Sequence, residues 1–197
     1  MTTSPEPAAR TRLAPDERRR QLLGIGLRKL VERPIQAVSV DEVAAEAGIS
    51  RGLLFHYFPT KAAYHDAVIG AAVRRVRRNI APDDGATGDE ALTQFVERYF
   101  AQIERRRDFY LALVFGSGAL ALGGDRVESL RAAIADQLAE RLELGPAALD
   151  VVHAWTAYVE DRALQWTADP VSERPRPLSD EVAHCTAALR TLLSLDS

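Results

Sequence analysis

Apolar residues recur every three or four positions along almost the whole chain, and no stretch alternates between apolar and polar residues as a half-buried strand would. Leu23, Leu27 and Leu30 keep this helical spacing, for example, until Pro34 ends the pattern. Further segments with the same period follow, and turns that contain glycine or proline separate them. The pattern predicts an all-α fold of about nine helices.

A turn-rich segment divides the chain into two helical parts. Residues 81–88 have the sequence Ala-Pro-Asp-Asp-Gly-Ala-Thr-Gly, which is typical of a loop. Before this loop we expect a disordered leader at 1–13 and a small three-helix domain at 14–60, whose connecting helix continues to about residue 80. After it, residues 81–197 are expected to form a larger helical domain with five of the helices.

The segment from Ser39 to Pro59 carries the signals of two short helices joined by a tight turn. Ser39 is placed to cap the first helix, and Glu42, three positions later, to complete a capping box. Gly48 follows, where a residue with positive φ would end that helix and turn the chain. Ser50 is placed to cap a second helix, which Pro59 ends after about two turns.

The second of these helices has an apolar face and a polar face. Leu54 and Phe58 are four positions apart and are expected to point inward. The residues left on its other faces are Arg51, Gly52, Leu53 and His56. A cation, a residue without a side chain and an imidazole suit close approach to a phosphate backbone and to base edges. From the spacing alone, a short amphipathic helix pair inside a helical core is an equally good interpretation.

The residues from Val40 to Lys61 resemble the signature of the TetR family of transcriptional regulators. The resemblance covers roughly residues 16 to 70 and is carried by Ala44, Ala47, Gly48, Ser50, Gly52, Leu54, His56, Tyr57, Phe58 and Lys61. It implies an N-terminal helix-turn-helix domain that binds double-stranded DNA. It also implies a C-terminal helical domain that binds an effector and forms a dimer.

The resemblance further implies a role for each polar residue of this segment. Ser39 and the backbone amides at the start of its helix would meet a phosphate, because the positive end of a helix dipole favours anions. The other residues expected on the DNA backbone are Ser50, Tyr57 and Lys61. The residues expected in the major groove are Arg51, Gly52, Leu53 and His56. Tyr57 as a half-buried aromatic residue and His56 as a solvated surface residue remain open alternatives.

Two residues depart from the family pattern. Leu53 stands where the family often has Thr, Ser or Ala, and Phe55 stands where Tyr is frequent. A leucine cannot donate a hydrogen bond, so any base recognition by Leu53 would be an apolar contact, for instance with a thymine methyl group. The operator sequence therefore does not follow by analogy.

The charge distribution agrees with a DNA-binding front part. Residues 1–78 hold 14 Lys and Arg residues against 8 Asp and Glu residues, a net charge of +6. The rest of the chain holds 11 against 20, a net charge of −9, so the overall charge of −3 hides a basic front and an acidic rear. Phosphate binding requires such a concentration of cations.

The chain has 197 residues, and 47% of them are hydrophobic, which is ordinary for a protein with a soluble core. Its single cysteine, Cys185, excludes an intrachain disulfide and suits a reducing cytoplasm. The longest uncharged stretch lies near residues 109–124. It is shorter than the roughly 20 residues that a membrane span needs, and glycines interrupt it. We therefore expect a cytoplasmic protein with no membrane partner.

The C-terminal domain is expected to have two tasks. By resemblance to the family, its last two helices, at about 146 to 168 and 179 to 195, would form the interface of a homodimer. Its other helices would enclose a pocket for an unknown small-molecule effector. Aromatic candidates for that pocket are Tyr99, Phe100, Phe109, Phe115, Trp155 and Tyr158. At helical spacing, however, such residues more often belong to an ordinary core.

No motif of an enzyme is convincing. The sequence Gly116-Ser117-Gly118 lacks the pattern of a nucleophile elbow. His153 with Glu160, and His184 with Cys185, have no third metal ligand at helical spacing. We predict no catalytic residue, no metal and no cofactor. The predicted function is a sequence-specific transcriptional regulator, a repressor that an effector releases from a near-palindromic operator. The alternative is an activator or an effector-independent DNA-binding protein of the same fold.

Overall fold

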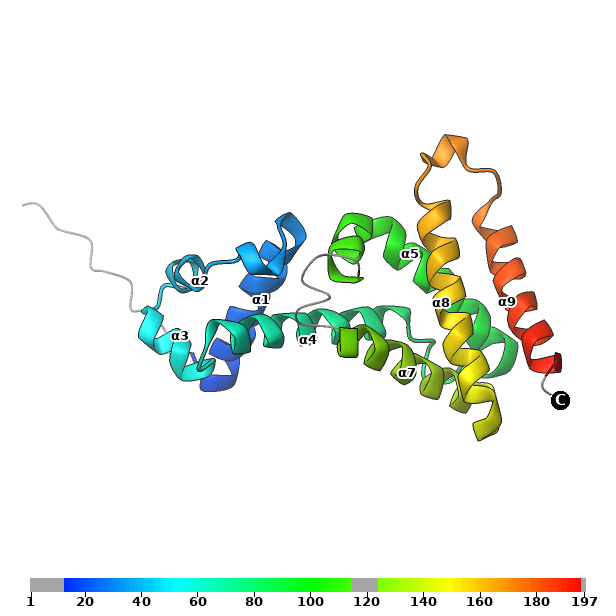
Figure 1. Ribbon diagram of the computed structural model, residues 1–197, viewed down its shortest axis with the longest axis horizontal. Coiled ribbons are helices and arrows are strands. Elements are labelled where there is room, and N and C mark those ends of the chain that lie inside the picture. The colour runs from blue at the N-terminus through cyan, green and yellow to red at the C-terminus, as the bar shows by residue number, and fades with distance from the viewer. Residues whose placement is uncertain (1–12, 115–123, 196–197) are drawn as a thin grey trace, which may run out of the picture.

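The computed structural model describes residues 13–114 and 124–195, and every regular element in these ranges is a helix (Figure 1). This confirms the all-α prediction. The α-helices within these ranges are α1 Pro15–Glu32, α2 Val40–Glu46, α3 Arg51–Tyr57, α4 Lys61–Ile80, α5 Gly88–Val114, α7 Gly124–Arg141, α8 Leu149–Trp166 and α9 Leu178–Leu195. Short 3-10 helices at Ile35–Ala37, Pro146–Ala148 and Val171–Glu173 connect some of them. None of the described helices is long and apolar enough to span a membrane.

The described part contains eight α-helices where about nine were expected for the whole chain. The difference lies partly in α5. The apolar stripe from Leu92 to Ile103 predicts one helix, and Asp108 is placed to begin a second, shorter one. The structure joins them into one element with a break at Arg106, whose φ of −147° and ψ of 38° are not helical. The expected interruption is therefore present as a kink rather than as a loop.

Helix α4 connects two groups of helices (Figure 1). We call α1, α2 and α3 the head, and α5, α7, α8 and α9 the body. The N-terminal part of α4 packs against α1 of the head, and α4 also packs against α5 and α7 of the body. The side chain of Thr60 caps α4 by accepting a hydrogen bond from the Ala63 amide at 3.0 Å. One continuous helix thus carries the head on the body.

The head is built around a small apolar core shared by its helices and the start of α4. Leu22 of α1 and Val68 of α4 are completely buried in this core. The Tyr64 hydroxyl donates a hydrogen bond to the Leu22 carbonyl at 2.8 Å. At Gly26 a Cβ atom would lie 2.4 Å from the Val68 side chain, so only glycine lets α1 and α4 approach this closely. This contact attaches α4 rigidly to the head.

The body places α8 and α9 side by side on its outer edge (Figure 1). The Trp155 indole of α8 is fully buried and donates to the Cys185 carbonyl of α9 at 2.9 Å. Arg162 of α8 forms an ion pair with Glu181 of α9, with an Nη2–Oε1 distance of 2.7 Å. These contacts make α8 and α9 one rigid pair.

Candidate nucleic-acid interface

The turn between α2 and α3 forms as the sequence predicts. The Ser39 hydroxyl caps α2 by accepting from the Asp41 amide at 3.2 Å. Gly48 has a φ of +66°, the left-handed conformation that glycine adopts without cost. The Ser50 hydroxyl caps α3 by accepting from the Leu53 amide at 3.2 Å. The two short helices are thus held at a defined angle.

One detail of the predicted capping is wrong. Glu42 does not complete a capping box with Ser39, because its carboxylate forms an ion pair with Arg33, which precedes the 3-10 helix before α2. An arginine nearby in space competes for the carboxylate with the local backbone amide, and a charged partner makes the stronger hydrogen bond. Glu42 therefore fixes α2 to the end of α1 instead of to its own cap.

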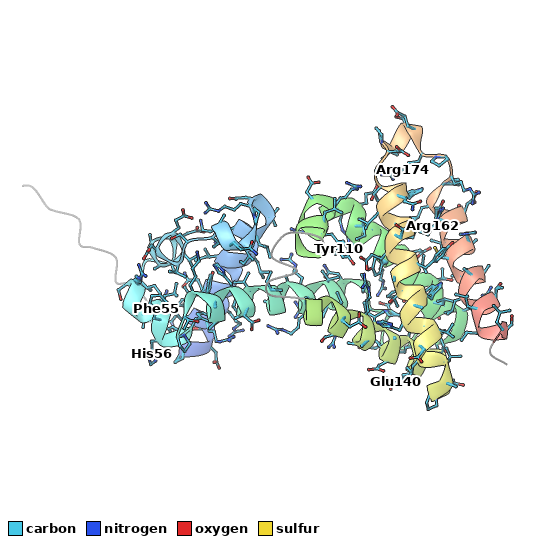
Figure 2. All side chains as sticks on the ribbon, in the orientation of Figure 1. Phe55, His56, Tyr110, Glu140, Arg162 and Arg174 are labelled. Carbon is cyan, nitrogen blue, oxygen red and sulfur yellow. The ribbon has the colours of Figure 1, made fainter. Side chains whose placement is uncertain are left out.

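Helix α3 buries one face and exposes the other. Leu54 and Phe58 are buried, with exposed fractions of 0% and 2%, as the sequence predicts. The residues exposed on the outer side of α3 are Arg51, Gly52, Leu53 and His56. Figure 2 shows His56 and Phe55 at the end of the molecule that is distant from α8 and α9. The apolar face thus holds α3 on the head while its polar face points outward.

Arg51 is held across the turn by a residue of the other helix. Its Nη1 atom lies 3.0 and 3.1 Å from the carboxylate oxygens of Asp41 on α2. Its guanidinium also lies over the Phe55 ring, 5.3 Å from the centroid. Both charged side chains are more than half exposed, so water weakens the pair. Asp41 was not identified from the sequence, since a partner ten positions away in a different helix leaves no periodic signal.

Gly52 is open to the outside. A Cβ atom at this position would have only the Ser50 hydroxyl within 4 Å, at a distance of 3.9 Å. Its backbone is not in the left-handed region, which among the described glycines is occupied by Gly48 and Gly88. Nothing inside the chain therefore requires glycine at Gly52. The missing side chain leaves the surface flat for something that approaches α3 from outside.

Two further candidates, Tyr57 and Lys61, lie at the end of α3 and the start of α4. The Tyr57 ring is half-buried against the core and meets the His56 ring edge-on, with centroids 5.6 Å apart. The exposed Lys61 ammonium donates to the Gln36 carbonyl at 3.2 Å. Together with Ser39 and Ser50, these side chains lie on α2, α3 and the start of α4, the elements of the turn region. The fold thus gathers the predicted residues on one end of the head.

In the body, three of the candidate pocket residues lie in the interior. Tyr99, Phe100 and Trp155 are buried with exposed fractions of 3% or less. The hydroxyl oxygens of Tyr99 and Tyr110 lie 2.6 Å apart and share a hydrogen bond. Burial raises the pKa of both tyrosine hydroxyls, and the negative charge of Glu160 raises it further. The interior of the body therefore contains a polar group of side chains within its aromatic core.

The other candidate pocket residues are placed differently. Tyr158 lies at a groove between α8 and α9, where its hydroxyl is 2.6 Å from His184 Nε2. This groove has a volume of about 500 Å³ and is lined mainly by small and apolar residues, Ala154, Trp155, Ala187, Ala188, Thr191 and Leu192. The side chain of Phe109 and all of Phe115 lie outside the described residues. Among the described residues, no group of three or more His, Cys, Asp and Glu side chains could hold a metal ion.

The head and the start of α4 are similar in sequence to a known protein family. The family described as "Bacterial regulatory proteins, tetR family" matches residues 23–68. The HTH-type transcriptional activator FasR of Mycolicibacterium smegmatis is 33% identical over 101 residues, which are 50% of this chain and 46% of FasR. The chain thus spans about half the length of this curated relative.

Two solved structures have a similar fold over most of the chain. A tetR-family transcriptional regulator from Streptomyces coelicolor is 26% identical and superposes with a TM-score of 0.71, covering 93% of this chain and 83% of that one. A transcriptional regulator from Pseudomonas aeruginosa PAO1 is also 26% identical, with a TM-score of 0.66 and 94% of both chains covered. The similarity therefore extends over the head and the body together.

Proposed function

We propose, from the premise that this chain belongs to the TetR family of DNA-binding transcriptional regulators, that it is a repressor which a small-molecule effector releases from its operator. Members of this family regulate transcription by binding DNA and are not enzymes. Repression, a homodimer and an effector are the parts that we propose. The protein would act in the bacterial cytoplasm, where its operator is.

The observation that carries this proposal is that α3 buries one face and exposes the other. Leu54 and Phe58 fix the helix to the head, and the opposite face, with Arg51 and His56, is left in solvent. Any amphipathic surface helix leaves a polar face in solvent. Helix α3 differs because it is the second helix of a helix-turn-helix, the position from which a recognition helix enters the major groove of DNA.

Each exposed residue suits a particular part of the duplex. Arg51 can donate two hydrogen bonds to a guanine edge, Leu53 can contact a thymine methyl group, and His56 can reach a neighbouring base. Gly52 lets the backbone of α3 approach the groove closely, because nothing else occupies its surface. The residues that we propose for phosphate contacts are Ser39, Ser50, Tyr57 and Lys61. The first two hydroxyls also cap helices, whose free amides favour an anion.

The groove between α8 and α9 supports a homodimer through this face. It is apolar and lies on the outer edge of the body, where a monomer would leave Ala154 and Leu192 in water. Two copies related by a two-fold axis would bury the same groove against itself, which gives an interface of four helices. Such a dimer presents two heads to a near-palindromic operator, with half-sites about one turn of DNA apart.

An effector pocket in the interior of the body remains our proposal for release. The buried Tyr99, Phe100 and Trp155 offer apolar contacts, and the tyrosine hydroxyls offer polar ones. Release requires only that the effector prefer the form whose heads are wrongly spaced for DNA. A differential affinity of about 1.4 kcal/mol would weaken operator binding tenfold.

One comparison favours a second candidate function. FasR, the relative that matches half of this chain, is named a transcriptional activator. The same head could therefore stimulate transcription when its operator lies upstream of a promoter instead of over it. An effector-independent regulator of the same fold is the remaining alternative.

The operator and the sign of regulation can be measured in two steps. Selection of bound fragments from random duplex DNA with the purified protein should return a near-palindromic site. Transcription from a promoter that overlaps this site should fall when the protein is added, whereas a rise would make the protein an activator. If the protein binds no duplex at low ionic strength, where phosphate contacts are strongest, the proposed function is wrong.

A further inference from the structure

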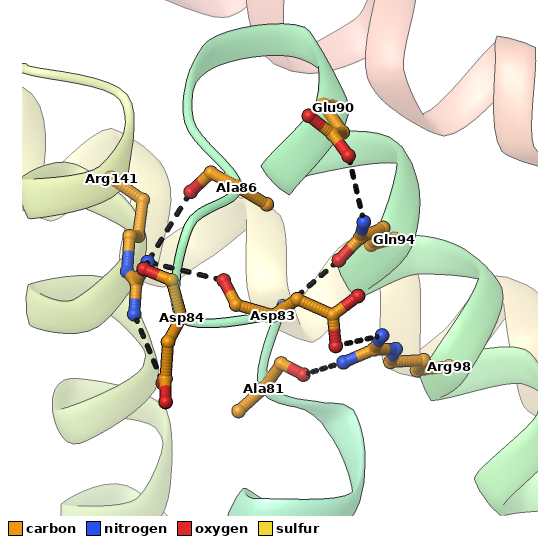
Figure 3. Close-up of polar contacts among 8 residues, drawn as sticks. All are labelled: Ala81, Asp83, Asp84, Ala86, Glu90, Gln94, Arg98 and Arg141. Atoms are coloured by element: carbon orange, nitrogen blue, oxygen red, sulfur yellow. Dashed lines mark hydrogen bonds and ion pairs between the residues drawn. The ribbon is translucent and has the colours of Figure 1, made fainter.

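The corner between α4 and α5 is held by two arginines that come from different helices (Figure 3). This corner comprises residues 81–87 and follows directly on the C-terminal end of α4. Arg98 of α5 donates to the Ala81 carbonyl and forms an ion pair with Asp83, with an Nη2–Oδ1 distance of 2.7 Å. Arg98 thus attaches the corner to the helix that directly continues the chain.

Arg141, the last residue of α7, attaches the same corner to a helix far away in the sequence (Figure 3). Its Nη1 atom shares its two hydrogens among three backbone carbonyls, those of Asp83 at 3.1 Å, Asp84, and Ala86 at 3.3 Å. Its Nη2 atom lies 3.7 Å from the Asp84 carboxylate. The Arg141 side chain is only 20% exposed. One guanidinium therefore holds the corner backbone at three residues.

Helix α7 is itself fixed to the interior of the body. Arg131 forms an ion pair with Glu160 of α8 at 3.0 Å, and Glu128 lies 3.0 Å from the His153 ring of the same helix. Glu160 also acts electrostatically on the Tyr99 and Tyr110 hydroxyls. Ten residues of helix, or about 15 Å, separate Arg131 from Arg141. The helix α7 therefore runs from the polar interior of the body to the corner of α4.

Away from the corner, α4 and α7 do not meet through charges. A hollow of about 500 Å³ lies between Arg77 and Arg78 of α4 and the α7 residues Asp136, Gln137 and Glu140. Within the part of the chain that the structure describes, none of these charged side chains forms an ion pair. Opposite charges thus face each other across open space. The polar connection between the C-terminal end of α4 and α7 is therefore made at the corner, through Arg141.

We propose that Arg141 is the positioning residue that couples the body to the head. By holding the corner, it makes the C-terminal end of α4 follow any displacement of α7, and α4 carries the head. A change in the interior of the body, where α7 is bound to α8, would then alter the direction in which α3 points. This inference rests on the proposed function for its biological meaning, but the coupling can be measured without DNA.

The measurement uses two spin labels within one chain, one in the head and one in the body. The buried Cys185 is replaced by alanine, and cysteines are introduced at the exposed positions Ala45 of α2 and Ala168 after α8. Labelled protein is diluted with unlabelled protein, so that only distances within one chain contribute. Pulsed electron spin resonance then gives the distribution of head-to-body distances, first for the unaltered corner and then for each variant.

Arg141→Ala should widen this distribution about twofold, because the pivot of α4 then has several positions of similar free energy. Arg98→Ala is the matched control: it removes the same charge from the same corner, but α5 stays joined to the corner through the chain. Its distribution should keep the width of the unaltered protein. Arg141→Lys, which retains a cation with three donors, should restore a narrow distribution. If Arg141→Ala does not fold, Arg141→Gln takes its place in the comparison.

Two results would overturn the inference. Equal widths for Arg141→Ala and the unaltered protein would show that α7 does not control the head. Equal widening by Arg141→Ala and Arg98→Ala would show that both arginines merely pack the corner. With the operator from the selection experiment, Arg141→Ala should also weaken binding about tenfold. An unaltered protein that binds no DNA would refute the proposed function, while the distance measurement would still decide the coupling.

Discussion

Among the exposed residues of α3, Arg51 has the side chain that is best preorganised for binding a partner. Its guanidinium is already extended over the Phe55 ring and held by Asp41, so little side-chain freedom remains to be lost on binding. An exposed ion pair of this kind contributes at most about 1 kcal/mol to stability. A guanine edge or a phosphate would therefore displace Asp41 easily, and the loss of Arg51 should affect binding more than folding.

Arg51→Ala should lower the affinity for the selected operator by about 1–3 kcal/mol and leave the thermal midpoint nearly unchanged. Fluorescence anisotropy with labelled operator, together with thermal unfolding, measures both quantities. Arg28→Ala is the matched control, since Arg28 is also an exposed arginine of the head in an ion pair, with Glu46, but it lies on α1. An equal loss of affinity in both variants would reduce the role of Arg51 to general positive charge.

At the scale of the element, two neighbouring leucines of α3 have different roles: one stabilises the fold, and the other is free to contact DNA. Leu54 is completely buried and Leu53 is 40% exposed, although they have the same side chain and belong to the same two turns. Leu54→Ala should destabilise the protein by about 2–5 kcal/mol, because it leaves a cavity in the head. Leu53→Ala should change stability by less than about 0.5 kcal/mol and alter the operator preference instead. Unfolding in urea and a repeated operator selection test the pair, and equal destabilisation would mean that α3 is held by both faces.

A buried histidine connects α4 to the segment before α2. The His65 ring is 4% exposed, and its Nε2 atom lies 3.0 Å from the Val38 carbonyl. Burial lowers the pKa of His65 below its ordinary value of 6.5. Below about pH 6.5 the unfolded chain therefore binds a proton that the folded chain resists, and the free energy of unfolding falls as the pH falls.

The slope of this change should not exceed about 1.4 kcal/mol per pH unit, which corresponds to one proton. Urea unfolding at a series of pH values between 5 and 7.5 measures it. His65→Gln keeps a hydrogen-bond donor but cannot titrate, so its stability should depend less on pH in this range. A variant with the same pH dependence as the unaltered protein would assign the effect to another group.

The elements of the head could be predicted because their signals are local. Gly48, Ser50 and Pro59 each act within one or two residues, through positive φ, a side-chain cap and a missing amide, and the structure agrees at all three positions. The partner of Glu42, in contrast, could not be predicted from local signals. Its partner Arg33 lies nine positions earlier, and only the fold decides that a charged side chain displaces the local backbone amide.

At the scale of the whole molecule, the same local signals do not specify which helix faces which. Tyr99 and Tyr158 both stand at apolar positions of long helices, yet one lies in the interior of the body and the other at the α8–α9 groove. The hydrogen-bond partners of Arg141 could not be predicted, because they are backbone carbonyls and carbonyls have no sequence signature. The DNA-reading elements are therefore visible in the sequence, whereas the connection between body and head is not.

The groove between α8 and α9 should determine whether the chain forms a dimer. Ala154 lies exposed in this groove, so Ala154→Arg would place two guanidinium groups near the two-fold axis of the proposed dimer. Ala132 of α7 is also an exposed helical alanine but lies outside the groove, which makes Ala132→Arg the matched control. Sedimentation equilibrium should give a dimer of 21.6 kDa chains for the unaltered protein and the control. The Ala154→Arg variant should sediment as a single chain.

The two states should also differ in operator binding. A dimer engages both half-sites of a near-palindromic operator, and the second contact then forms at a high effective concentration. Ala154→Arg should therefore bind the whole operator at least about a hundredfold more weakly than Ala132→Arg, with the two variants binding an isolated half-site alike. A dimeric Ala154→Arg variant would move the interface to another face. A monomeric variant with full operator affinity would instead mean that one head suffices to recognise the site.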